Sequence, residues 1–341
     1  MTNARRPARA RVITVVKILV GFGLLAAVLW TNRAQLRDVL SRKIEGWHFA
    51  LGFLLYVAGM VLSFVRWGIY VRAVGVNFPQ RDALRIGFIA NLFNFIVPGG
   101  PVGGDVVRAT LLCREHTEWK TQAIASVLLD RLIGLLALCL LACAGGSLAW
   151  ERIDAPVRRL VVISWVAAAV VTGILAVGFS PALYRPLAKR FAHRKRLARR
   201  LDALVATGSA YRARLHIVVA GLGMAIVTHT LIILSFHQAG LALFPVVPSL
   251  AEHFLIVPLV LVSTALPLPF GALGLSEGLS AHLFGLTSFP GGAVAMMGFR
   301  VLQYGTAFLS TFVYLGSLRQ ARSLAEASAQ LVDEPLVDAE R

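Results

Sequence analysis

The chain has 341 residues, of which 57% are hydrophobic and only 15% are charged, and its mean hydropathy is +0.73. An average soluble domain is about 45–50% apolar and about 25% charged. This composition therefore excludes a disordered chain, a collagen-like fibre and a disulfide-stabilised scaffold, and it argues against a soluble enzyme. The formal net charge is +17. A large positive net charge is common in nucleic-acid-binding proteins. In an apolar chain, however, what the charge indicates depends on where the cations lie relative to the apolar runs.

Six stretches are apolar and long enough to cross a bilayer, which takes about 20 mostly apolar residues. They cover residues 12–30, 49–70, 124–150, 160–179, 215–244 and 293–318. The first follows an arginine-rich segment and has no A-x-A cleavage site after it, so we expect an uncleaved helix rather than a signal peptide. These runs predict an all-α polytopic membrane protein with about six spanning helices.

The basic residues indicate how the chain is oriented. Residues 180–214 hold ten Lys and Arg against one Asp, and the positive-inside rule places such a loop in the cytoplasm. Counting helices from it puts both termini in the cytoplasm of a bacterial inner membrane, although residues 31–45, which are also basic, then lie outside. We expect the 180–214 loop to attract anionic lipid headgroups; a specific partner site is the alternative. No nucleic-acid motif accompanies the charge, so no nucleic-acid partner is expected, and no cofactor is indicated.

Two further apolar segments, residues 86–113 and 254–285, are broken by proline and glycine. Each is typical of a short helix, a Gly-rich turn and an acidic residue that opens a second short helix. The first break contains Pro98, Gly99, Gly100, Gly103 and Gly104 before Asp105, and the second contains Pro269, Gly271 and Gly274 before Glu277. Neither half is long enough to span a bilayer comfortably, so we predict two re-entrant hairpins. Irregular backbone at membrane depth is tolerated only where protein buries it or it lines a wet cavity, so the turns should face the interior.

The order helix, helix, broken pair, helix occurs twice, the second time from Leu160. With the predicted topology the two halves start on opposite sides of the membrane, which is the order of an inverted repeat. In transporters with such repeats, paired broken segments mark the binding site. A coincidence of hydropathy is the alternative.

Several polar residues lie within these apolar segments. Asp105 is compatible with a helix N-cap, with a salt bridge to a cation such as Arg108, or with a headgroup ligand or proton carrier. For Glu277, Ser276 is available as the cap, which frees the carboxylate for function. Neighbouring residues on a helix do not face each other, so Asp130 and Arg131 need partners elsewhere. The candidate partners are Arg108 for Asp130 and Asp105 for Arg131.

Other intramembrane polar residues fit structural roles at least as well. Arg66 lies near a helix end and is expected to snorkel to the interface. Arg300 and Gln303 share one helix face, which we expect to point inward. His229 is expected to be a hydrogen-bonded core residue, and Asn91 and Asn94 share a face from which they could bond the turn or a headgroup.

Three blocks of these residues resemble the transmembrane flippase domain of lysylphosphatidylglycerol synthases. The blocks are Asn91-x-x-Asn94-x-x-x-Pro98-x-x-x-x-Gly103-Gly104-Asp105-x-x-Arg108, then Asp130-Arg131-x-x-Gly134, then Pro269-x-Gly271-x-x-Gly274-x-x-Glu277. The resemblance covers nearly the whole chain. It implies a helical membrane protein with re-entrant segments that moves an anionic or glycosylated lipid, or a lipid-linked precursor, between leaflets. The residues expected to bind it are Asn91, Asn94, Pro98, Gly99, Gly100, Gly103, Gly104, Asp105, Arg108, Asp130, Arg131, Pro269, Gly271, Gly274, Glu277 and Arg300.

The resemblance also limits what to expect. Full-length synthases carry a large soluble domain after the membrane region, whereas here residues 1–318 are the expected membrane domain and residues 319–341 a short polar cytoplasmic tail. We therefore expect membrane lipids as partners and no synthase activity. The alternatives are a membrane enzyme that acts on lipid headgroups or polyprenyl phosphates, and a scaffold for a lipid-pathway enzyme.

Overall fold

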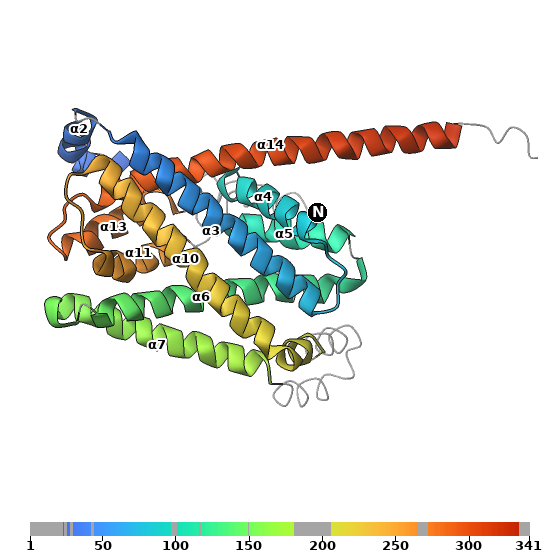
Figure 1. Ribbon diagram of the computed structural model, residues 1–341, viewed down its shortest axis with the longest axis horizontal. Coiled ribbons are helices and arrows are strands. Elements are labelled where there is room, and N and C mark those ends of the chain that lie inside the picture. The colour runs from blue at the N-terminus through green and yellow to red at the C-terminus, as the bar shows by residue number, and fades with distance from the viewer. Residues whose placement is uncertain are drawn as a thin grey trace, which may run out of the picture.

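A computed structural model describes residues 23, 26–27, 30–41, 44–96, 101–115, 117–148, 150–180, 206–264 and 272–333 (Figure 1). Throughout these residues the regular structure is helical, with no strand. The long helices are α3 (Gly46–Ala73), α6 (Lys120–Leu148), α7 (Ala155–Gly178), α10 (Leu215–Leu243) and α14 (Gly292–Asp333). The shorter ones are α2 (Arg33–Ser41), α4 (Gln80–Ile96), α5 (Pro101–Glu115), α11 (Leu250–Thr264) and α13 (Leu275–Gly285).

Four of the described helices, α3, α6, α7 and α10, are long and apolar enough to cross a membrane. They match four of the six predicted spans and make the chain a multi-pass membrane protein. The predicted span at residues 12–30 lies almost wholly outside the described residues. The sixth is helical but less apolar than the others, and its helix α14 continues past the predicted end at residue 318 to Asp333.

Both broken segments contain two short helices, as predicted: α4 and α5 in the first, α11 and α13 in the second. Residues 97–100, between α4 and α5, and residues 265–271, after α11, lie outside the described residues. The expectation that Gly103 and Gly104 belong to the turn is wrong, because both lie inside α5. Pro101 occupies the first position of that helix, where its fixed φ and missing N–H suit a helix start.

Gly104 lies where α5 packs against α4. A Cβ atom at this position would overlap Asn94 Oδ1 and lie 2.5 Å from the carbonyl oxygen of Ala90. The glycine is therefore required by the close approach of the two helices rather than by a turn.

Replacing Gly104 with alanine should destabilise the protein by about 1–3 kcal/mol, the usual range for overpacking. The matched control is Gly173→Ala on α7, where nothing lies within 4 Å of an added Cβ. There the substitution should stabilise the helix by up to about 1 kcal/mol, since alanine is the better helix former. Unfolding of both variants in detergent micelles measures the contrast, and equal shifts would contradict the close packing at Gly104.

The helix order α3, α4, α5, α6 recurs as α10, α11, α13, α14, and the packing recurs with it. Helix α6 packs against α11 as α14 packs against α4, and α6 packs against α10 as α14 packs against α3. The equivalent helices α3 and α10 run antiparallel (Figure 1). At one end Glu45 N donates to Ala242 O at 3.2 Å, and at the other Tyr211 Oη donates to Tyr70 O at 3.0 Å. Opposite directions for equivalent helices are what the predicted inverted repeat requires.

The two halves meet along a glycine seam, formed by Gly52 and Gly59 of α3 against α10. A Cβ atom would lie 3.2 Å from Ser235 O at Gly52 and 3.0 Å from Thr228 O at Gly59. The Ser235 hydroxyl also donates to Gly52 O at 2.7 Å. Small residues allow helix backbones to approach closely in membranes, so the two halves contact each other through main chain.

Candidate functional site

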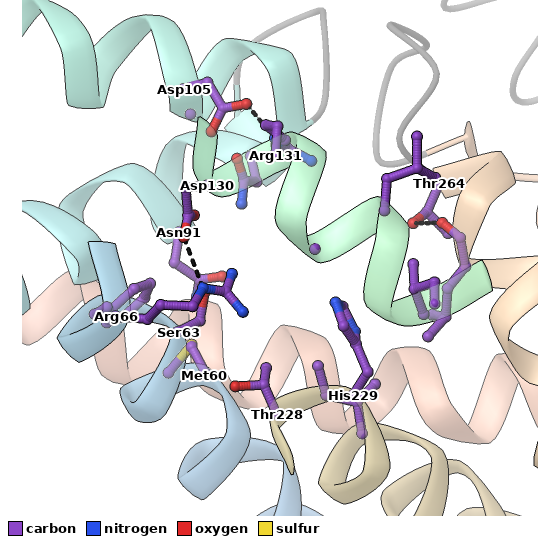
Figure 2. A pocket seen from close by; sticks show the side chains of 18 of the residues that line it. Met60, Ser63, Arg66, Asn91, Asp105, Asp130, Arg131, Thr228, His229 and Thr264 are labelled. Carbon is purple, nitrogen blue, oxygen red and sulfur yellow. Dashed lines mark hydrogen bonds and ion pairs between the residues drawn. The ribbon is translucent and has the colours of Figure 1, made fainter. Parts of the chain in front are cut away.

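A cavity of about 370 Å³ lies at the centre of the bundle, lined by residues of α3, α4, α5, α6, α10, α11 and α14. Its volume is in the range of small-ligand sites, about 300–1,000 Å³. Five charged side chains line it: Arg66, Asp105, Arg108, Asp130 and Arg131. Figure 2 shows Arg66 reaching the open space from α3 and His229 reaching it from α10.

Asp130 holds three helices together at this cavity. Its carboxylate accepts from Arg66 Nε at 2.8 Å and from Arg108 Nη1 at 3.2 Å. All three side chains are buried. The predicted pairing of Asp130 with Arg108 is confirmed, whereas the expectation that Arg66 snorkels to the interface is wrong. Because the carboxylate is bound from two sides, α3, α5 and α6 are fixed relative to one another.

Asp105 and Arg131 form the second ion pair of the cavity, as predicted. Asp105 does not cap its helix, because it is the fifth residue of α5. This pair is less buried than the first, with side-chain exposures of 18% for Asp105 and 39% for Arg131. It therefore forms one wall of the cavity where solvent or lipid can reach it.

Four residues that line the cavity each hold a buried polar atom without a hydrogen-bond partner among the described residues. The atoms are Arg66 Nη1, Arg108 Nε, Thr228 Oγ1 and His229 Nδ1. A buried polar group without a partner is unfavourable by about 1–3 kcal/mol. The four residues come from both halves of the repeat and surround one space. A polar ligand or water in this space would supply the missing partners once the side chains turn toward it.

Asn91 and Asn94 lie three residues apart on α4 and have different surroundings. Asn91 Nδ2 donates to Ser310 Oγ at 3.1 Å and to Thr306 Oγ1 at 3.5 Å, which ties α4 to α14. Asn94 lines the cavity beside Gly104. Asn91 is thus held by structural hydrogen bonds, and Asn94 is the more available of the two.

Glu277 and Arg300 form a separate ion pair away from the cavity. Glu277 is 0% exposed, and its Oε2 accepts from Gly274 N at 2.7 Å. Gly274 is the N-cap of α13 and has a φ of 82°, a conformation that favours glycine. The expectation that Ser276 caps this helix is wrong, because its hydroxyl donates to Ala272 O at 3.1 Å. The carboxylate of Glu277 does the capping, and the structure does not bring it together with the first block.

The two ion pairs nevertheless occupy corresponding places in the repeat. Each joins an acidic residue near the start of the second short helix to an arginine on the long helix that follows. The Asp105–Arg131 pair is partly exposed, whereas the Glu277–Arg300 pair is buried. Of the remaining predicted site residues, Gly103 is buried in α5, and five lie outside the described residues: Pro98, Gly99, Gly100, Pro269 and Gly271.

The predicted site did not include Arg66, Thr228 or His229. A signal for Arg66 is present in the sequence: it follows Gly52 and Gly59 at spacings of seven residues, so all three share one helix face. Rows of small residues mark the contact face of a membrane helix, which indicates that Arg66 points inward.

Comparisons with known proteins agree with this architecture. The family model described as the lysylphosphatidylglycerol synthase TM region matches residues 14–310. A UPF0104 membrane protein, PH1989 from Pyrococcus horikoshii, is 21% identical over 120 residues, which are 35% of this chain and 36% of that protein. The chain thus matches little more than a third of that relative's length. No solved structure matches the chain. Because the family model covers most of its length, the chain belongs to the lysylphosphatidylglycerol synthase transmembrane-region family.

Proposed function

We propose that this protein moves an anionic or glycosylated lipid between the leaflets of a membrane. The observation that carries the proposal is the central cavity, which both halves of the repeat line with residues that hold unpartnered polar atoms. A lipid headgroup crosses hydrocarbon slowly because its polar groups lose their hydrogen bonds there. A cavity that holds charged and polar side chains among the membrane helices supplies replacement partners for these groups.

The charges of the cavity favour a negative headgroup. Three arginines against two aspartates give these five side chains a net charge of +1. Arg66 Nη1 and Arg108 Nε are unpartnered guanidinium donors, and such forks suit phosphate and carboxylate oxygens. The hydroxyls of a glycosylated headgroup would accept from the same donors.

The rest of the proposal follows from the broken segments. Helices α4 with α5 and α11 with α13 act as re-entrant hairpins. The sequence contains no G-x-x-x-x-G-K-[ST] motif, the phosphate-binding loop of many ATPases. A transmembrane gradient, or the unequal amounts of the lipid in the two leaflets, therefore supplies the energy. The setting is a bacterial inner membrane with both termini in the cytoplasm, and lipid-pathway enzymes are natural partners.

A proteoliposome assay tests the proposal. Purified protein is reconstituted with a fluorescent anionic lipid, and the fraction accessible to an external quencher is followed over time. The informative variant is Thr228→Val with His229→Leu, which removes two unpartnered polar groups and leaves the Arg66–Asp130 and Asp105–Arg131 ion pairs in place. Translocation should slow by about tenfold, since hydrogen bonds to charged groups contribute about 1.5–3 kcal/mol, while folding stays intact.

The matched control is Thr172→Val on α7, whose hydroxyl donates within its own helix to Ala168 O at 2.8 Å. It should translocate as the wild type does. A wild type no faster than protein-free liposomes, or a double variant as fast as the control, would overturn the proposal. Lipid turnover by the pure protein, read by mass spectrometry, would instead support an enzyme that acts on headgroups.

A further inference from the structure

A second hollow lies on the flank of the molecule between α5 and α6. This groove has a volume of about 910 Å³ and is lined mainly by apolar side chains, among them Val102, Val106, Ile124 and Leu128. All four are exposed, at 41–60% of their surface. The other long helices also expose apolar residues, as membrane proteins do, but here the apolar residues form a concave site.

The two ends of the groove are polar. At one end Arg114 lies in the last turn of α5 and Lys120 is the first residue of α6, and both side chains are exposed. At the other end are Asp105 and Arg131. The groove thus has a cationic end at the helix termini and an ion pair at the other end, with an apolar wall between them.

The Asp105–Arg131 pair also lines the central cavity. The groove and the cavity are therefore adjacent spaces separated by one ion pair. This pair is partly exposed: 18% of the Asp105 side chain and 39% of the Arg131 side chain are accessible. A headgroup that enters at the cationic end and moves along the groove reaches this pair, and so the edge of the cavity.

We infer that the α5–α6 groove binds an anionic phospholipid, with an acyl chain along the apolar wall and the phosphate at Arg114 and Lys120. The inference rests on the proposed function, for which the groove is the lateral entry and the Asp105–Arg131 pair is the gate to the cavity. Charge complementarity commits the site to an anionic lipid: each cation near the membrane surface favours an anionic headgroup by about 1 kcal/mol, or about fivefold.

Cys113 provides a native probe of the groove. It is partly exposed and lines the groove, whereas Cys139 and Cys143 are buried in the core. A lipid in the groove should shield the Cys113 thiol from a maleimide. Detergent-solubilised protein is titrated with phosphatidylglycerol or with phosphatidylcholine, and alkylation of Cys113 is measured by mass spectrometry.

Phosphatidylglycerol should protect Cys113 at a lower concentration than phosphatidylcholine, and the Lys120→Gln variant should shrink that difference about fivefold. The control is Arg159→Gln, an exposed cation of α7 away from the groove, which should leave the difference unchanged. Equal protection of the wild type by the two lipids, or none, would overturn the inference.

A second measurement links the groove to transport. Ile124→Trp fills the groove, and Ile163→Trp places the same ring on the outer face of α7; the two isoleucines are 51% and 58% exposed. Only Ile124→Trp should slow translocation in proteoliposomes. If both variants translocate as the wild type does, the groove is not the entry and the proposed function stands. If the wild type moves no lipid while Cys113 is protected selectively, the proposed function fails and the binding site stands.

Discussion

Replacing Asp130 with alanine should destabilise the folded protein by about 3–5 kcal/mol, the range for removing one partner of a buried ion pair. The carboxylate is bound by Arg66 at 2.8 Å and by Arg108 at 3.2 Å, and the loss would leave two buried guanidinium groups without a counter-charge. Unfolding in detergent micelles measures the change in the free energy of unfolding. The control is Asp154→Ala, an exposed N-cap of α7 whose side chain makes no capping hydrogen bond.

A triple variant separates the structural role of this cluster from its functional one. Asp130→Ala with Arg66→Met and Arg108→Met removes all three charges, and apolar replacement of a buried ionic cluster is often neutral or stabilising. We expect it to recover most of the stability that the single variant loses and to remain unable to translocate lipid. A single variant as stable as Asp154→Ala, or a triple variant that translocates normally, would contradict this account.

Replacing Glu277 with alanine should have the second large effect. Its carboxylate is fully buried, is paired with Arg300 and accepts from Gly274 N. The substitution leaves Arg300 buried without that counter-charge, which should lower the free energy of unfolding by about 3–5 kcal/mol. It also leaves the start of α13 uncapped. Glu277→Gln keeps an acceptor for the Gly274 N–H, so it should be less damaging by about 1 kcal/mol, the usual contribution of a cap.

The chain offers a matched control for this variant at the start of α11. Glu252 has the same position in its helix, and it accepts from Ser249 N at 2.7 Å in an exposed setting. Glu252→Ala should cost about 1 kcal/mol, so the difference between the two alanine variants measures the buried charge. Equal destabilisation, read from thermal unfolding of both proteins, would show that Glu277 acts only as a cap.

Apolar runs and proline–glycine breaks sufficed to predict the helices that dominate this fold. Hydropathy reports whether a segment is apolar enough to cross a bilayer, and it predicted the spans α3, α6, α7 and α10 directly. It does not report which way a side chain faces on its helix. For that reason the burial of Arg66 was missed, and Glu277 was expected at the same site as Asp105.

The chemistry of neighbouring residues explains which ion pairs were predicted correctly and which helix starts were not. The pairs Asp130–Arg108 and Asp105–Arg131 were predictable because adjacent charges on one helix cannot pair with each other. The start of α5 was predicted too late because Pro101 was taken as part of the turn instead of the first helical residue. Likewise, Ser276 was expected to cap α13, whereas a helix that starts after Gly274 puts Glu277 at the position from which a longer side chain reaches back.

The glycine seam between α3 and α10 sets how closely the two halves of the repeat approach each other. An added Cβ atom would lie 3.2 Å from Ser235 O at Gly52 and 3.0 Å from Thr228 O at Gly59. A bulky side chain at either position would therefore act as a wedge that pushes the two halves apart. Because Thr228 also lines the central cavity, a wedge at Gly59 would change the width of the cavity without replacing any residue that lines it.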